Sequence, residues 1–284
     1  MASRRIDTRA IGLDVGMQFA RWLTGAEHLH YGLWNDLAVN AGNVGRAQAA
    51  YTQKLLGLFP GESLKVLDVG GGAGETAGEM GALGHTVDIV TPSKMLAERC
   101  RVNAPKATTH QSKFEDFTSD ERFDLALFSE SFQYIPPQLA LAKACQLINP
   151  GGHVLISDCF RSDRFERSAE KRAVGGGHAV ANFQKIVADM PLETLMTDDI
   201  TEAVAPSIDI EQGFYKILGT AVFRYDEELL DKRPKTRWLA HRLLRLLVSE
   251  RRRNRLLQRL QGDERTSDVF LQNNRYLQIL MKRV

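Results

Sequence analysis

The sequence contains only three cysteines, Cys100, Cys145 and Cys159, and they are widely separated. An odd number of scattered thiols fits neither a disulfide framework nor a zinc site, so we expect reduced cysteines and no bound metal. No apolar run approaches the length of a membrane span, and no apolar stretch follows the arginines near the amino terminus as it would in a secretory signal. These absences favour a cytoplasmic protein.

The net charge is also small, at +2, but it is unevenly distributed. The segment 232–260 contains eleven Lys or Arg residues and one acid, Glu250, so it carries +10 and the remaining residues together carry −8. This distribution excludes a uniformly basic nucleic-acid-binding protein, and we expect no nucleic-acid partner. It marks one segment as a candidate contact surface.

The chain has 284 residues, of which 43% are hydrophobic and 25% are charged, and these values are typical of one large elaborated domain. Short apolar runs separated by helix-length segments predict parallel strands at 64–69, 86–90, 123–128 and 152–157, with two further strands at 192–197 and 276–282. We therefore expect a Rossmann-like, doubly wound α/β fold with a mostly parallel sheet and a helical cap. The expected parts are a helical cap at 1–60, an α/β core at 61–200, a basic helical insertion at 201–265 and a C-terminal strand at 266–284.

The most informative motif is Asp68-Val69-Gly70-Gly71-Gly72-Ala73-Gly74, which follows a predicted strand and precedes a predicted helix. Alternate glycines allow a tight turn and a close approach of the backbone to a ligand. A carboxylate at the strand end would repel a pyrophosphate but suits a ligand with ammonium and sulfonium groups. The spacing also differs from the G-x-G-x-x-G fingerprint of dinucleotide-binding proteins.

A second motif, Leu147-Ile148-Asn149-Pro150-Gly151-Gly152-His153-Val154-Leu155-Ile156-Ser157-Asp158, follows at a suitable separation. With the glycine motif, and with Glu27-His28-Leu29-His30-Tyr31-Gly32-Leu33-Trp34, the sequence resembles class I S-adenosylmethionine-dependent methyltransferases. The resemblance is to the small-molecule and lipid-modifying branch, which includes tocopherol and sarcosine methyltransferases and cyclopropane synthases. It implies an enzyme that methylates an oxygen, nitrogen or carbon atom of a small molecule, such as a secondary metabolite or a lipid-like compound.

The resemblance also implies a cofactor site for S-adenosylmethionine. Its expected residues are Tyr31, Asp68, Gly70, Gly72, Gly74, Thr91, Pro92, Met95, Phe114, Glu115 and Ser129. Two positions depart from the common family pattern. The acid that usually holds the ribose is missing, so Thr91 is the candidate and Asp88 its rival, while Lys113 stands where many relatives have an acid near adenine. Phe114 is expected to stack on the adenine, although it could instead pack beneath the sheet edge.

Methyl transfer from a sulfonium needs alignment of the reacting atoms, and it needs a base only if the acceptor loses a proton. The catalytic candidates are His30, Tyr31, Gln133 and Tyr134, and none stands out as a required base. Gln133 replaces a glutamate of the cyclopropane synthases, which weakens the case for alkene cyclopropanation. An alternative is a methyltransferase-fold protein that binds the cofactor but acts as a cyclase, a decarboxylase or a non-catalytic binding protein.

Leucines recur at near-helical spacing among the arginines of segment 232–260, which predicts one or two amphipathic helices. Three readings remain open from the sequence. The segment could attach to an anionic membrane surface, contact an acidic carrier protein or form a homodimer, or pack its leucines onto the core with its arginines solvated.

Overall fold

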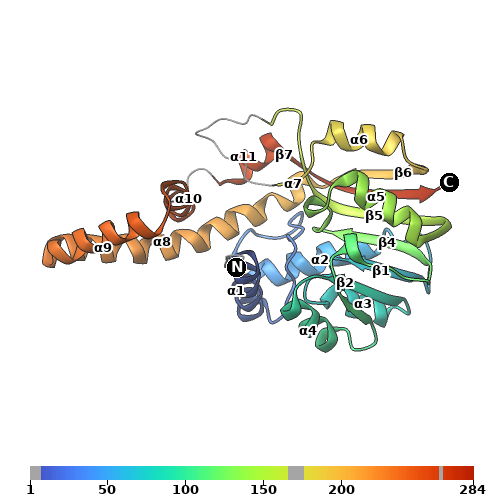
Figure 1. Cartoon of the computed structure of the whole chain (residues 1–284), viewed down its shortest axis with the longest axis horizontal. Helices are drawn as coiled ribbons and strands as arrows, with labels where there is room; N and C mark the ends of the chain where they lie inside the picture. Colours follow the sequence, from blue (N-terminus) through green and yellow to red (C-terminus); the bar gives the residue numbers. More distant parts are fainter. Residues whose placement is uncertain (1–7, 166–175, 262–264) are drawn as a thin grey trace, which may run out of the picture.

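The computed structural model describes residues 8–165, 176–261 and 265–284, and a seven-stranded sheet forms its centre (Figure 1). The strands are β1 (Lys65–Val69), β2 (Thr86–Thr91), β3 (Thr108–Gln111), β4 (Phe123–Ser129), β5 (Ile148–Arg161), β6 (Leu192–Asp199) and β7 (Asn274–Arg283). Their spatial order is β3-β2-β1-β4-β5-β7-β6, and only β7 runs antiparallel to its neighbours within this sheet. The predicted doubly wound, mostly parallel sheet is thus confirmed.

The predicted strands agree with the structure in place and differ mainly in length. β5 is much longer than the predicted 152–157, because it begins at Ile148 and continues to Arg161 along β7. β3 was not predicted. Its sequence, Thr-Thr-His-Gln, is short and polar, as suits an edge strand that is not covered on both faces.

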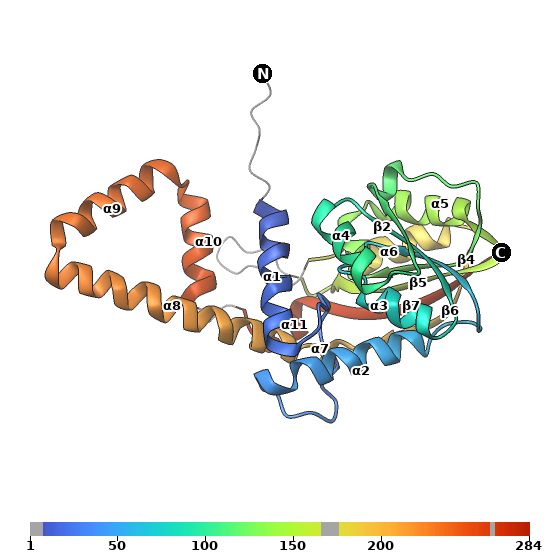
Figure 2. The same ribbon diagram turned by 90° about the horizontal axis from the view of Figure 1, so that it is seen from below.

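Helices cover both faces of the sheet (Figures 1 and 2). One layer contains α5 (Pro137–Leu147) and α6 (Val180–Ala188), and the other contains α2 (Val44–Leu56), α3 (Glu75–Ala82), α4 (Lys94–Asn103), α7 (Thr201–Val204) and α11 (Ser267–Asn273). Side chains alternate between the layers, so Leu67 and Val69 of β1 pack toward α5 while Val66 packs toward α2 and α3. Burial on both faces explains why the parallel strands read as continuous apolar runs.

The amino-terminal part crosses the carboxyl edge of the sheet. It is helical only in α1 (Thr8–Thr24) and α2, with a short 3₁₀ turn at Ala41–Asn43. Glu27 is buried between them, and its carboxylate accepts hydrogen bonds from Arg99 at 2.7 Å and Asn103 at 2.8 Å, both on α4. These contacts hold the following segment, 28–31, against the strand ends.

Three helices, α8 (Pro206–Lys232), α9 (Pro234–Leu247) and α10 (Glu250–Gln261), form an arm that extends away from the sheet (Figures 1 and 2). The sequence predicted one or two amphipathic helices in 232–260, and the structure has two there, α9 and α10. Within the described chain no residue of α9 is buried, so the leucines of α9 do not pack onto the core, whereas Leu260 of α10 is buried. None of the helices in the described residues is both long and apolar enough to cross a bilayer.

Gly74 begins α3 with φ +89°, and a Cβ atom there would lie 2.7 Å from the Cα atom of Cys100 on α4. Gly74→Ala should therefore lower the free energy of unfolding by at least about 2 kcal/mol, through left-handed strain and overpacking. Gly81→Ala, in the same helix with open space around its Cβ, should be neutral or stabilising by about 0.5–1 kcal/mol. Urea unfolding measures both, and equal stability of the two variants would contradict the assignment of Gly74 to a tight turn.

Candidate functional site

The loop after β1 lies where the strand order reverses, between β1 and β4, and such a point opens a crevice at the carboxyl edge of a doubly wound sheet. Gly70 and Gly72 both have positive φ, at +77° and +56°, so the loop needs glycine at alternate positions. A side chain on Gly71 would clash with the carboxylate of Asp68. The carboxylate of Asp68 therefore lies directly against the backbone of this loop.

Asp68 is only 2% exposed, and its Oδ2 atom has no hydrogen-bond partner among the described residues. Burial raises the pKa of Asp68 to about 7. A buried carboxylate with an unsatisfied oxygen is costly unless a donor or a cation reaches it. This position fits a ligand that brings a positively charged, hydrogen-bond-donating group to the glycine loop.

A second carboxylate, Glu130, follows β4 in a left-handed conformation with φ +52°, which is uncommon for a residue with a side chain. Its Oε1 atom accepts hydrogen bonds from the Tyr31 backbone N–H at 2.7 Å and from the Tyr276 hydroxyl at 2.8 Å. Burial raises the pKa of Glu130 to about 7, although both hydrogen bonds oppose that shift. The same group thus binds the amino-terminal segment to β7.

Behind Glu130, the hydroxyl of Tyr276 lies 2.8 Å from the hydroxyl of Tyr51 on α2, which in turn lies 2.7 Å from Ser157 Oγ. Both tyrosines are fully buried, so their network is shielded from water. Asp158, beside Ser157, is also buried, and its pKa is raised to about 8, first by burial and in smaller part by Glu130. Its Oδ2 atom accepts a hydrogen bond from the Gln133 backbone N–H at 3.0 Å.

A cleft of about 250 Å³ opens beside Glu130. Its walls come from stretches far apart in the sequence and consist of Tyr31, Glu130, Gln133, Tyr134, Cys159, Gly176, Glu211, Arg265 and Tyr276. Three of the four predicted catalytic residues, Tyr31, Gln133 and Tyr134, are therefore brought together at one opening. The cleft can place a small molecule next to a carboxyl group that titrates near neutral pH.

The fourth predicted catalytic residue, His30, lies behind Tyr31 and does not line the cleft. Its Nδ1 atom is 2.8 Å from the carbonyl oxygen of Tyr31, its Nε2 atom is 3.1 Å from both His28 Nδ1 and Thr52 Oγ1, and its ring stacks on Tyr51. Burial is the main cause that lowers the pKa of His30, to about 3. His30 is thus a neutral, hydrogen-bonded support for Tyr31.

The predicted ribose and adenine residues lie at the ends of β2 and β3. Thr91, Pro92 and Met95 follow one another from the end of β2 into α4, and Thr91 is buried. Its rival, Asp88, lies further back on β2 and pairs with His110 Nε2 at 2.9 Å, so it has a structural partner that the sequence did not reveal. The structure therefore places Thr91 nearer the carboxyl edge.

Phe114 is buried in the core, with its ring edge-on to Phe128 at 5.5 Å between centroids, so most of its surface is already in contact with protein. Glu115 is exposed beside it in the short 3₁₀ helix Phe114–Asp116. Ser129 ends β4, with its Oγ atom 3.2 Å from the Tyr51 hydroxyl. These three residues keep their predicted roles as untested expectations.

Sequence reasoning missed four residues of the cleft or of its support: Tyr51, Glu211, Arg265 and Tyr276. They lie on α2, α8, the segment before α11, and β7, and none belongs to a local motif. Glu130 also lines the cleft, directly after β4. Its left-handed backbone, which no sequence pattern indicated, is the feature that sets it apart.

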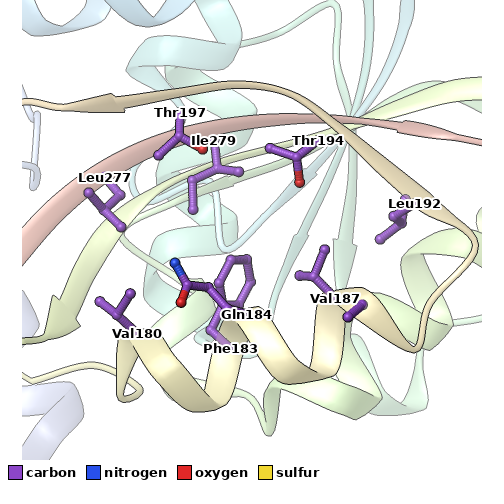
Figure 3. A pocket seen from close by; sticks show the side chains of 10 residues that line it. Val180, Phe183, Gln184, Val187, Leu192, Thr194, Thr197, Leu277 and Ile279 are labelled. Carbon is purple, nitrogen blue, oxygen red and sulfur yellow. The ribbon is translucent and has the colours of Figure 1, made fainter. Parts of the chain in front are cut away.

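A second hollow, of about 370 Å³, lies between α6 and strands β6 and β7 (Figure 3). Its labelled side chains are mainly aliphatic, and they include Val180, Val187 and Leu277. It contains no titratable side chain and none of the predicted site residues. The chemistry-bearing residues are therefore those around the glycine loop and Glu130.

Comparisons with known proteins identify relatives of part of this chain, including the glycine loop and Glu130. A family model described as a methyltransferase domain matches residues 43–187, just over half of the chain. The ubiquinone biosynthesis O-methyltransferase of Vibrio parahaemolyticus is 34% identical over 117 residues, which cover 39% of this chain and 48% of that protein. The chain therefore matches about half the length of this curated relative.

Solved structures share the whole fold at low sequence identity. The geranyl diphosphate C-methyltransferase of Streptomyces coelicolor, solved with Mg²⁺, geranyl-S-thiolodiphosphate and S-adenosyl-L-homocysteine, has a TM-score of 0.64 at 14% identity, covering 100% of this chain and 99% of that one. A cyclopropane synthase of Mycobacterium tuberculosis has a TM-score of 0.66 at 15% identity, covering 95% of both chains. At such identities the likeness establishes the fold alone.

The raised pKa of Asp68 predicts a pH-dependent stability difference between the wild type and Asp68→Asn. Folded Asp68 keeps its proton up to a pKa of about 7, whereas the unfolded chain loses it near the ordinary value of 3.8, so rising pH favours unfolding of the wild type in this window. Asparagine does not titrate. The stability of Asp68→Asn relative to wild type should rise by up to about 1.4 kcal/mol per pH unit from about pH 4 and level off above about pH 7.

Urea unfolding of the two ligand-free proteins across this pH range measures that difference in stability. The buried histidines are the same in both proteins, so their contributions to the difference cancel. A difference that stays constant with pH would contradict the burial of an unpaired carboxylate under the loop.

Proposed function

This chain belongs to the family of methyltransferase domains, and on that premise we propose that it transfers the methyl group of S-adenosylmethionine to a small-molecule acceptor. The observation that carries the proposal is the buried Asp68 carboxylate, whose Oδ2 atom lacks a partner in the described chain, beneath a loop of alternate glycines. We propose a secondary metabolite or a lipid-like compound as acceptor, methylated at oxygen, nitrogen or carbon.

The residues at the carboxyl edge fit this cofactor. Asp68 offers a carboxylate to an ammonium group, and the absence of a side chain at Gly72 leaves room for the ligand to approach. Thr91, Pro92 and Met95 are proposed for the ribose side, and Phe114 and Glu115 for the adenine side. When bound, the sulfonium supplies a methyl group with a neutral thioether as leaving group. The protein's task is therefore mainly to hold the acceptor in line.

The cleft beside Glu130 is the proposed acceptor site. Tyr31, Gln133 and Tyr134 would position the acceptor, with His30 fixing the orientation of Tyr31 from behind. Where the acceptor must lose a proton, Glu130 is the proposed base, because its carboxyl group lines the cleft and its pKa is about 7. The hydrogen bonds from Tyr31 and Tyr276 would stabilise Glu130 in its ionised form.

Asp68→Asn tests the cofactor site. Loss of a buried charge partner costs about 2–5 kcal/mol in binding, so we expect the dissociation constant of S-adenosylmethionine to rise at least about thirtyfold. Isothermal titration measures this value. Asp189→Asn, at an exposed position after α6 and away from the glycine loop, is the matched control and should bind as the wild type does. Unchanged affinity in Asp68→Asn would remove Asp68 from the cofactor site.

Glu130→Gln tests the acceptor site. The variant should bind S-adenosylhomocysteine as the wild type does, because Glu130 faces the acceptor cleft, but it should transfer a deuterated methyl group at least about a hundredfold more slowly if a proton must be removed. Mass spectrometry of a metabolite extract incubated with the labelled donor detects the product. Tight cofactor binding by the wild type without any labelled product would favour the cyclase, decarboxylase or binding-protein alternative. Equal rates in variant and wild type would exclude Glu130 as the base.

A further inference from the structure

The outer helix of the arm, α9, has an uncovered row of leucines. Leu239, Leu243, Leu246 and Leu247 are 51%, 48%, 75% and 82% exposed. At about 100° per residue these four positions lie on one side of the helix. A contiguous exposed apolar face of this kind marks an interaction surface more often than a solvated one.

On the opposite side of α9, two polar side chains contact α8. Arg237 donates two hydrogen bonds to the carboxylate of Asp226, at 3.0 and 2.7 Å, and His241 Nε2 lies 2.7 Å from the same carboxylate. Arg237 and His241 are rotated by roughly half a turn from the centre of the leucine row. Because these polar contacts fix which side faces α8, the leucines face away from the rest of the arm.

Basic side chains flank the leucine row. Lys235, Arg242 and Arg245 are exposed, and the Arg242 guanidinium lies 5.1 Å from the centroid of the Trp238 ring. Segment 232–260 as a whole carries +10, against −8 for the remaining residues. An amphipathic helix with exposed leucines on one side and arginines beside them is suited to lie in the plane of a membrane interface.

The charge argues against a second copy of this chain as the occupant. In a two-fold symmetric dimer the same patch meets itself, so two copies of segment 232–260, each carrying +10, would be brought together. An anionic lipid surface instead attracts the arm, by about 1 kcal/mol for each basic residue near the surface. We propose that α9 docks on an anionic lipid bilayer, with its leucines at the acyl boundary and its arginines among the headgroups.

The base of the arm reaches the acceptor cleft. Glu211 of α8 lines the cleft and is paired with Arg259 of α10 at 2.5 Å and with Arg265 at 3.2 Å. Gln212 also donates a hydrogen bond to the Arg259 carbonyl oxygen at 3.0 Å. This connection places the acceptor cleft at the base of the docked arm. We therefore infer, and this step rests on the proposed methyl transfer, that the docked protein takes its acceptor from the lipid phase.

Co-sedimentation of the full chain with vesicles tests the docking, in the absence of methyl donor and acceptor, so that its outcome is independent of the methyl-transfer result. The chain should bind vesicles of phosphatidylcholine with phosphatidylglycerol and not vesicles of phosphatidylcholine alone, and added salt should weaken the binding. Leu246→Asp/Leu247→Asp should reduce partitioning at least about tenfold. These side chains are exposed, so the change does not disturb the core.

Leu83→Asp/Val102→Asp is the matched control, because both residues are similarly exposed but lie at the ends of α3 and α4, outside the arm. It should bind as the wild type does. Arg242→Glu/Arg245→Glu should also bind at least about tenfold more weakly. Equal binding by all variants would overturn the proposal, as would failure of the wild type to bind anionic vesicles. If the wild type does not bind anionic vesicles, light scattering shows whether it is a dimer. A dimer that Leu246→Asp/Leu247→Asp disrupts would assign the leucine face to a second copy of this chain. A monomeric wild type would leave an acidic protein as the partner.

Discussion

The constraint on which this site depends is the burial of three carboxyl groups at the carboxyl edge of the sheet, none with a salt bridge in the described chain. Asp68, Glu130 and Asp158 lie at the ends or along the edge of β1, β4 and β5, which are adjacent in the sheet. Among the described residues none of the three forms a salt bridge, and burial raises the pKa of each. Such groups favour their protonated forms until a cationic ligand stabilises the carboxylate. The edge is therefore prepared both for a positive ligand and for proton transfer.

The position of Glu130 shows how distant parts of the chain maintain this edge. Its left-handed backbone turns the side chain toward Tyr31 and Tyr276, whose donors hold one carboxylate oxygen. Tyr276 belongs to the antiparallel strand β7, and Tyr51, its partner, belongs to α2. The C-terminal strand and the amino-terminal helix thus both reach the proposed acceptor site. Their contribution to the geometry of the site is as direct as that of the glycine loop.

Local motifs explain what the sequence predicted well. Asp68 and the following glycines lie within a few residues of one another, so their shared place after a strand could be inferred without tertiary structure. Glu211, Arg265 and Tyr276 come from separate elements and meet only through folding, which leaves no local pattern. The arm shows a different limit of prediction from sequence. Its leucine spacing predicts an amphipathic helix, but the same spacing serves a helix packed on a core and a helix that faces away from it. The exposure of the α9 leucines and the contacts of Arg237 and His241 with Asp226 distinguish the two.

Charge separation along the chain gives the arm a further property, which is orientation. With +10 in segment 232–260 and −8 elsewhere, an anionic surface attracts the distal arm and repels the remainder of the protein. Attraction of the arm and repulsion of the remainder favour the same orientation. A docked molecule would therefore hold its arm against the bilayer and its sheet away from the bilayer. Because Glu211 joins the base of the arm to the cleft, this orientation would also fix where the cleft stands relative to the surface. A uniformly basic protein would gain adhesion from its charge but no defined orientation.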